Sequence, residues 1–141
     1  MKLESQVVSL ELSKKLKALG VKQESAFYWQ AVQSLKVFKG VKVDAEWHLY
    51  SKTEMDRTPI FSVYDTRSAF TVAELGEMLP QDTWSICQWN GWFCKRMAGN
   101  ACIDIKSNEK SPYSKEQEAD TEADARAKML IYLIEKGIVK P

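Results

Sequence analysis

The stretch "SICQWNGWFC", residues 85–94, places an Asn-Gly pair between two short runs that are rich in aromatic residues. Such a pair is the strongest short-range signal of a β-hairpin, because a type I′ turn needs positive φ at both of its central residues. With the Asn-Gly pair as the turn, Trp89 is expected opposite Trp92, and Cys87 opposite Cys94. The stretch therefore predicts two antiparallel strands, from which the rest of the sheet is built outward.

The hairpin is expected to continue into a third strand after a turn at Gly99-Asn100, with Lys95 opposite Asp104. Because side chains alternate along a strand, the three strands sort their residues onto two faces. The expected core face carries Cys87, Trp89, Trp92, Cys94, Ile103 and Ile105, and the other face carries Trp84, Ile86, Gln88, Phe93, Lys95, Met97, Cys102 and Asp104.

The second of these faces also holds large apolar side chains, which is unusual for a sheet face turned to water. An exposed apolar patch of more than a few hundred Å² marks a partner or ligand site. Trp84, Phe93 and Met97 are therefore the predicted partner-binding residues. The partner is expected to be another protein or a second copy of the chain.

The three cysteines are expected to be thiols. An odd number of cysteines and no disulfide framework is typical of a reducing compartment, so we expect a cytoplasmic protein. A structural zinc site needs four closely spaced ligands, and the chain has no Cys-x-x-Cys pair and a single histidine. The sequence therefore predicts no metal site, and no motif indicates a cofactor.

Length and composition indicate one globular domain over residues 1–141. The chain is 45% hydrophobic and 28% charged, with a formal net charge of +1, so no overall field favours nucleic acid or membrane. No apolar run reaches the roughly 20 residues of a membrane helix, and the N-terminal residues lack a signal-peptide core. We therefore expect no membrane partner.

Three helices are predicted. The first spans residues 10–19, with Ser9 as its N-cap, a leucine stripe and Gly20 as its stop. The second begins at a capping box of Thr71 and Glu74 and ends before Pro80. The third spans residues 122–136 and carries a continuous apolar stripe.

Three further strands are predicted at residues 25–32, 46–52 and 60–65, where β-branched and aromatic residues gather. Residues 51–59 read as a polar connection, and residues 32–45 and 106–118 read as loops. The predicted fold is a single α+β domain with a largely antiparallel sheet and about three helices. The first and last helices are expected to pack on one face of that sheet.

Two alternatives to a binding protein remain open. Lys36, Phe38, Lys39 and Lys42 lie in a lysine-rich N-terminal third, and lysine beside an aromatic ring is typical of single-stranded nucleic-acid binding. His48, beside Glu46 on an expected strand, is the one candidate general base, but no nucleophile motif accompanies it. The sequence therefore favours a non-catalytic protein and assigns no catalytic residue.

Three segments, "SLELSKKLKALGVKQESAFYW", "SAFTVAELGEMLP" and "EADTEADARAKMLIYLIEKG", carry a resemblance. Together they resemble a family of small uncharacterised bacterial proteins linked to prophages and mobile elements. The resemblance implies a phage-associated accessory role and carries over no functional residue. The leading hypothesis is a non-catalytic binding or accessory protein that uses an aromatic sheet face or a helix groove.

Overall fold

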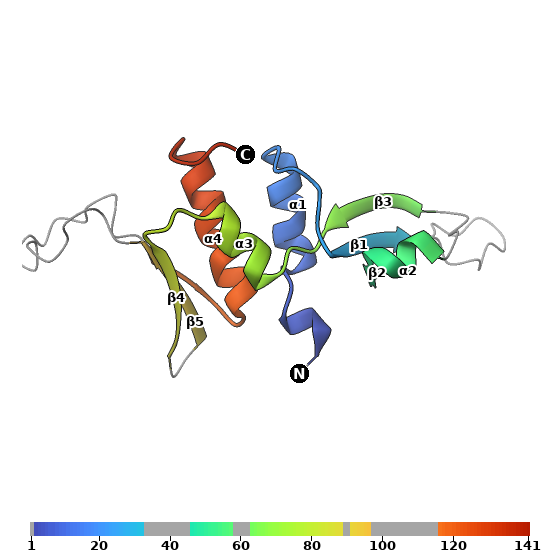
Figure 1. The fold of residues 1–141 in the computed structure, drawn as a ribbon, viewed down its shortest axis with the longest axis horizontal. Helices are drawn as coiled ribbons and strands as arrows, with labels where there is room; N and C mark the ends of the chain where they lie inside the picture. The colour runs from blue at the N-terminus through green and yellow to red at the C-terminus, as the bar shows by residue number, and fades with distance from the viewer. Residues whose placement is uncertain (1, 33–45, 58–62, 89–90, 97–115) are drawn as a thin grey trace, which may run out of the picture.

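The computed structural model describes residues 2–32, 46–57, 63–88, 91–96 and 116–141. These ranges contain four α-helices and two antiparallel three-stranded sheets (Figure 1), which confirms the predicted α+β class and the antiparallel pairing. The strands divide between two sheets, whereas the sequence suggested one. The reason is that alternation assigns a strand's faces but does not name its neighbour.

The first sheet has the order β2-β1-β3, with β1 (Phe27–Val32) in the centre, β2 (Glu46–Ser51) on one side and β3 (Val63–Ser68) on the other. The strand expected at residues 60–65 corresponds to β3, which continues through Ser68; residues 60–62 of that expectation lie outside the described residues. The expected loop at residues 32–45 falls outside the described residues, except that Val32 ends β1.

A short helix, α2 (Lys52–Arg57), follows β2 directly, where the sequence suggested only a polar connection. The helix starts with a capping box, which the polar composition of the segment did not suggest. The Glu54 backbone N–H donates to Ser51 Oγ at 3.2 Å, and the Ser51 backbone N–H donates to a Glu54 carboxylate oxygen at 2.8 Å. The Ser-x-x-Glu spacing therefore indicated the start of a helix, although the polar composition of the segment suggested an irregular connection.

The second sheet has the order β4-β5-β6, formed by β4 (Thr83–Gln88), β5 (Gly91–Arg96) and β6 (Glu116–Ala119). Its hairpin register differs from the prediction. Cys87 lies opposite Trp92, and Gln88 lies opposite Gly91, which makes residues 89 and 90 the connection. The shift moves partners by two residues, so the described residues of β4 and β5 keep their predicted faces. Cys87, expected on the core face, is nevertheless exposed.

Gly91 explains the register. It begins β5 with φ +147°, and a Cβ added there would lie 2.8 Å from the Ala119 carbonyl oxygen. The close approach of β6 therefore requires a glycine at this position, which sequence reasoning had assigned to the turn.

The expected partner of the far edge of β5 is also corrected, while residues 97–115, with the expected turn at Gly99-Asn100, lie outside the described residues. β6 occupies that edge of β5, with Lys95 opposite Glu116 and not Asp104, and their side chains form an ion pair at 2.8 Å. Residues 116–118, expected as loop, are therefore strand. The segment "EQEA" shows no hydrophobic alternation, so nothing in its composition marked it.

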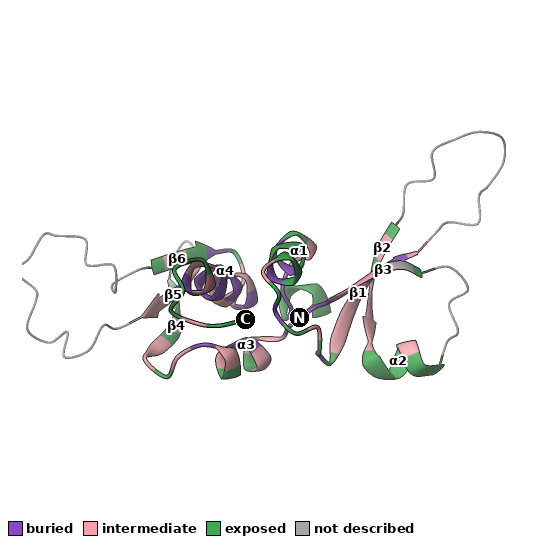
Figure 2. Ribbon diagram, turned by 90° about the horizontal axis from the view of Figure 1, so that it is seen from above, coloured by how far each residue is buried: buried purple, intermediate pink, exposed green. Residues whose placement is uncertain are grey.

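The hydrophobic core lies around α4 (Glu122–Glu135), of which seven residues are buried. One side of α4 covers the second sheet, and its other sides meet α3 (Val72–Met78) and α1 (Leu10–Ala18) (Figure 2). Both views place α1 between α4 and the first sheet, so α1 does not share one sheet face with α4. The apolar stripe predicted for the last helix forms the centre of the core.

The ends of α1 follow the predicted pattern only in part. Gly20 has φ +86°, and the Val21 N–H donates to the Leu16 carbonyl at 3.1 Å, as a Schellman-type stop requires. At the other end, Ser9 holds the N-cap position without a side-chain cap bond. Its backbone N–H instead donates to the Asp124 carboxylate at 2.8 Å, which ties the start of α1 to the start of α4.

The capping box of α3 is confirmed, and its glutamate does more than cap. The Glu74 carboxylate accepts from Thr71 N–H at 2.7 Å and from the Thr71 hydroxyl at 2.9 Å. It also accepts from Ala26 N–H at 2.8 Å and from Ser25 Oγ at 3.0 Å, just before β1. One carboxylate therefore joins the helical core to the first sheet.

Burial by itself would raise the pKa of Glu74, but these four hydrogen bonds to the charged form outweigh it and hold that pKa below its ordinary value of 4.5. The stabilisation from ionised Glu74 is therefore complete above the unfolded-state pKa and is lost as pH falls through the lower folded-state pKa.

We expect Glu74→Gln to lower the free energy of unfolding at pH 7, because the amide cannot accept all four hydrogen bonds. The difference from the wild type should shrink as the pH falls below about 4.5. Urea melts of both proteins across this range measure it. Glu77→Gln, an exposed carboxylate on the same helix, is the control. A gap between wild type and Glu74→Gln that is independent of pH would contradict the proposed tie.

Candidate functional site

The outer face of the second sheet is the face turned away from α4, and it carries Trp84, Ile86, Phe93 and Lys95 in the described strands. Trp84 is 40% exposed and Ile86 is 42% exposed, and they follow each other on the same face of β4. Phe93 is half-buried opposite Ile86. The register thus brings together two of the three predicted binding residues, and Met97 lies outside the described residues.

Charged side chains bound the outer face on one side only. Lys95 pairs with Glu116 at 2.8 Å, and its ammonium nitrogen lies 5.9 Å from the centre of the Phe93 ring. Glu118 lies opposite Phe93 on β6. An apolar centre with a polar rim is the usual anatomy of a protein interface. Toward β4 there is no such rim, because that strand carries no charged residue.

The opposite face of the same strands is fixed to α4, and this attachment keeps the outer face turned toward solvent. Ser85 donates to the Glu122 carboxylate, and Arg126 donates to Ser85 Oγ at 2.9 Å and to Glu122 at 2.9 Å. These bonds join β4 to α4. Cys94, in the middle of β5, is fully buried against the core. A rotation that buried Trp84 would break this cluster and expose the Cys94 side.

The guanidinium of Arg126 also reaches α3. A Cβ added at Gly76 would lie 2.8 Å from its Nη1 atom, so this close neighbour is consistent with a glycine inside that helix. The cluster therefore fixes β4, α3 and α4 relative to one another. Its three side chains, Ser85, Glu122 and Arg126, bond to one another and leave no activated nucleophile.

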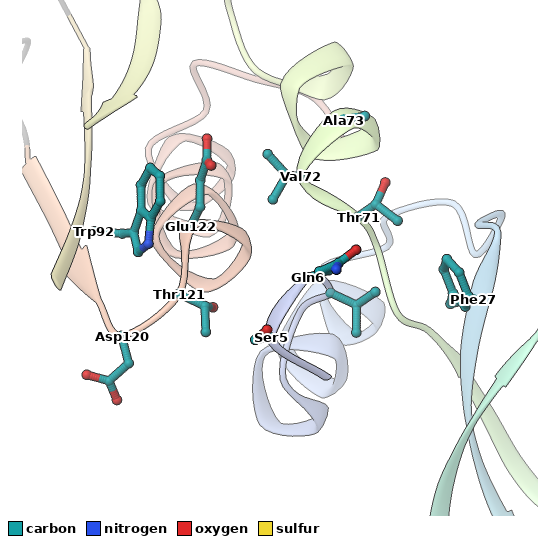
Figure 3. Close-up of a pocket in the computed structure, with 11 residues that line it drawn as sticks. Ser5, Gln6, Phe27, Thr71, Val72, Ala73, Trp92, Asp120, Thr121 and Glu122 are labelled. Atoms are coloured by element: carbon teal, nitrogen blue, oxygen red, sulfur yellow. The ribbon is translucent and has the colours of Figure 1, made fainter. Parts of the chain in front are cut away.

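A cleft of about 430 Å³ opens where α3 and α4 begin (Figure 3). Trp92 and Glu122 stand at one end, Phe27 stands at the other, and Gln6 lies between them. Eleven described residues line it, and they include no histidine, cysteine, lysine or arginine. Its size suits a small ligand. The hydroxyls of its lining, on Ser5, Thr71 and Thr121, each bond to a group outside the lining. No lining carboxylate is therefore seen to activate one of them, and the cleft supports no catalytic assignment.

His48 lies on an edge strand away from both regions. It is exposed, with Nε2 3.6 Å from the Glu46 carboxylate and its ring against Tyr50 at 6.3 Å. Neither of these two neighbours is a serine, threonine or cysteine nucleophile. The enzyme alternative therefore gains no supporting geometry.

The nucleic-acid alternative rests on Lys36, Phe38, Lys39 and Lys42, which all lie outside the described residues. The lysines of α1 are described, and two of them are engaged within the protein. Lys17 pairs with Asp65 at 2.8 Å, and the Lys14 nitrogen lies 5.4 Å from the Trp47 ring centre. A phosphate would have to displace these contacts, so α1 offers a weak basic surface.

No protein-family model, curated protein or solved structure matches the chain. The resemblance to prophage-linked bacterial proteins therefore stays a prediction that rests on three sequence segments. Within the described ranges, every helix is too short or too polar to cross a bilayer. In the same ranges, no three side chains of metal-ligating type come together.

Sequence reasoning placed Ile86 on the outer face but did not name it as a binding residue, although it is the most exposed large apolar side chain described. It missed the cleft entirely, because residues 5–7, 71–73 and 120–122 meet there only through the tertiary fold. The alternation that selected Trp84 and Phe93 would have selected Ile86 as well.

Cys94 gives a direct test of whether the middle of β5 is buried. Burial raises the pKa of its thiol to about 11, with the Glu122 charge adding to the rise and the Arg126 charge opposing it. We expect Cys94 to resist alkylation by iodoacetamide in the native protein at pH 8, because the thiolate is the reactive form. The exposed Cys87 should be modified under the same conditions. Peptide mass spectrometry separates the two sites. Both cysteines lie on the inner face of the hairpin, so the contrast tests whether α4 covers the middle of β5, and rapid native modification of Cys94 would contradict that burial.

Proposed function

We propose that this protein is a non-catalytic binding protein whose partner docks on the outer face of the second sheet. The observation that carries this proposal is the pair Trp84 and Ile86, both about two-fifths exposed and adjacent on one strand. Tryptophan is over-represented among the residues that dominate binding energy in protein interfaces. A phage-associated accessory role is part of the proposal and is supported by the sequence resemblance alone.

The arrangement of the sheet supports a rigid docking surface. β5 is paired on both sides, and the inner face is held by the buried Cys94 and by the cluster of Ser85, Glu122 and Arg126. Trp84 and Ile86 lie on β4, which pairs with β5 along its whole length and is joined to α4 through Ser85. The backbone that carries them therefore loses little further freedom on binding, which lowers the entropic cost. The cleft beside Trp92 is less favoured, because its aromatic residues are already partly buried.

A photo-crosslinking amino acid, p-benzoylphenylalanine, at position 84 tests the proposal in living cells. We expect ultraviolet light to join the protein at this position to one defined partner, because the side chain faces outward. The same amino acid at position 138 is the matched control, since Ile138 is similarly exposed but lies beyond the end of α4.

Stability measurements complete this test. Ile86→Ser should change the free energy of unfolding by no more than about 0.5 kcal/mol, as for other exposed positions, while it weakens partner capture. A loss of several kcal/mol, near the roughly 2–5 expected for a buried aliphatic side chain, would mean that the outer face is covered. That result, or equal crosslinking from positions 84 and 138, would contradict the proposal.

A further inference from the structure

The two sheets leave four described edge strands, and one of them differs from the others. Natural edge strands avoid unwanted pairing by carrying charges, prolines or bulges. Charged residues are present on β2, β3 and β6, namely Glu46, Asp65, Arg67, Glu116 and Glu118. The remaining edge strand, β4, has neither charge nor proline, and its six pairs with β5 run without a bulge. It therefore carries none of these three protections against pairing with another strand.

The backbone of β4 is also oriented for such pairing. Two residues separate Gln88 from Gly91, so this pair exchanges both backbone hydrogen bonds, and every second pair along the hairpin does the same. Ser85 lies between two such pairs, so its N–H and C=O point away from β5. In the described part of the chain, these two groups meet no other backbone group.

We propose that β4 pairs in antiparallel orientation with β4 of a second copy of this chain, with Ser85 opposite Ser85 at the twofold axis. This register places Trp84 of each copy opposite Ile86 of the other, at non-hydrogen-bonded positions where side chains approach most closely. Aromatic and β-branched residues form favourable cross-strand pairs. The inference rests on the proposed function, because the second copy uses the same outer face.

Self-complementarity argues for a second copy as the occupant. Because β4 is uncharged, antiparallel pairing with itself brings no like charges together along the strand. On the inner face, Ser85 is flanked by the ion pair of Arg126 and Glu122, whose side chains are 21% and 23% exposed. The twofold axis therefore brings one neutral ion pair toward another. The product is a continuous six-stranded sheet with α4 of each copy on the same side.

Two single substitutions test this register with the full-length protein. In a homodimer, Trp84→Lys or Ile86→Glu would set an unpaired charge against an apolar side chain twice, once on each side of the axis. Sedimentation equilibrium of each variant alone should show a dimer dissociation constant raised at least about tenfold. Ile138→Lys, a charge introduced at an exposed apolar position outside the sheet, should leave the dissociation constant unchanged.

An equimolar mixture of Trp84→Lys and Ile86→Glu should recover association, because the new ammonium group at position 84 of one copy faces the new carboxylate at position 86 of the other. The second contact in that heterodimer keeps the native tryptophan and isoleucine. Recovery also shows that both variants are folded. The recovered association should weaken with salt, because an ion pair has replaced an apolar contact.

Wild-type protein that stays monomeric at millimolar concentration would overturn the second-copy inference. A dimer that neither substitution weakens, or a mixture that stays monomeric, would overturn it as well. These failures differ from failure of the proposed function. A monomer that crosslinks through position 84 to a different protein would keep the outer face as a binding surface and exclude self-pairing.

Discussion

Burial of α4 is the interaction on which the rest of the structure depends. Its first half presents Ala123 and Ala127, and its second half presents larger side chains such as Leu130. The helix contacts β5 and β6 as well as α1 and α3, and these small and large buried side chains together fill the space among them. Removal of one such leucine typically costs about 2–5 kcal/mol, which is a large share of the roughly 5–15 kcal/mol that holds a domain folded.

The first sheet is attached differently. No residue of β1, β2 or β3 belongs to the main core cluster. Its described attachments are mostly polar, such as the Trp29 indole N–H to the Val8 carbonyl at 2.9 Å, Lys17 to Asp65, and Glu74 to the residues before β1. Polar attachments are directional but weak, since each net hydrogen bond contributes about 0.5–1.5 kcal/mol. The first sheet should therefore open at lower free energy than the α4 core.

Local sequence signals predicted local structure well and tertiary pairing poorly. The capping box at Thr71 and the stop at Gly20 depend on a few neighbouring residues, so the sequence contains all that decides them. The strand β6 pairs with residues more than twenty positions away, and "EQEA" has no pattern of its own. The outer face of β4 was predicted because parity survives a two-residue shift of register. The cleft at Trp92 could not be predicted in this way, since five separate parts of the chain form it.

The exposed apolar residues described in this chain differ in how they are arranged, and this difference distinguishes the outer face as a binding surface. Leu3, Val63 and Ile138 each stand on a different element, and scattered apolar residues of this kind are normal on protein surfaces. Trp84 and Ile86 are adjacent on one face of one strand, and that strand is the uncharged edge of its sheet. Each feature alone would have an ordinary explanation. Together they place exposed apolar surface and available backbone hydrogen-bonding groups at the same edge. A strand added at that edge would pair with the backbone groups and cover the apolar surface.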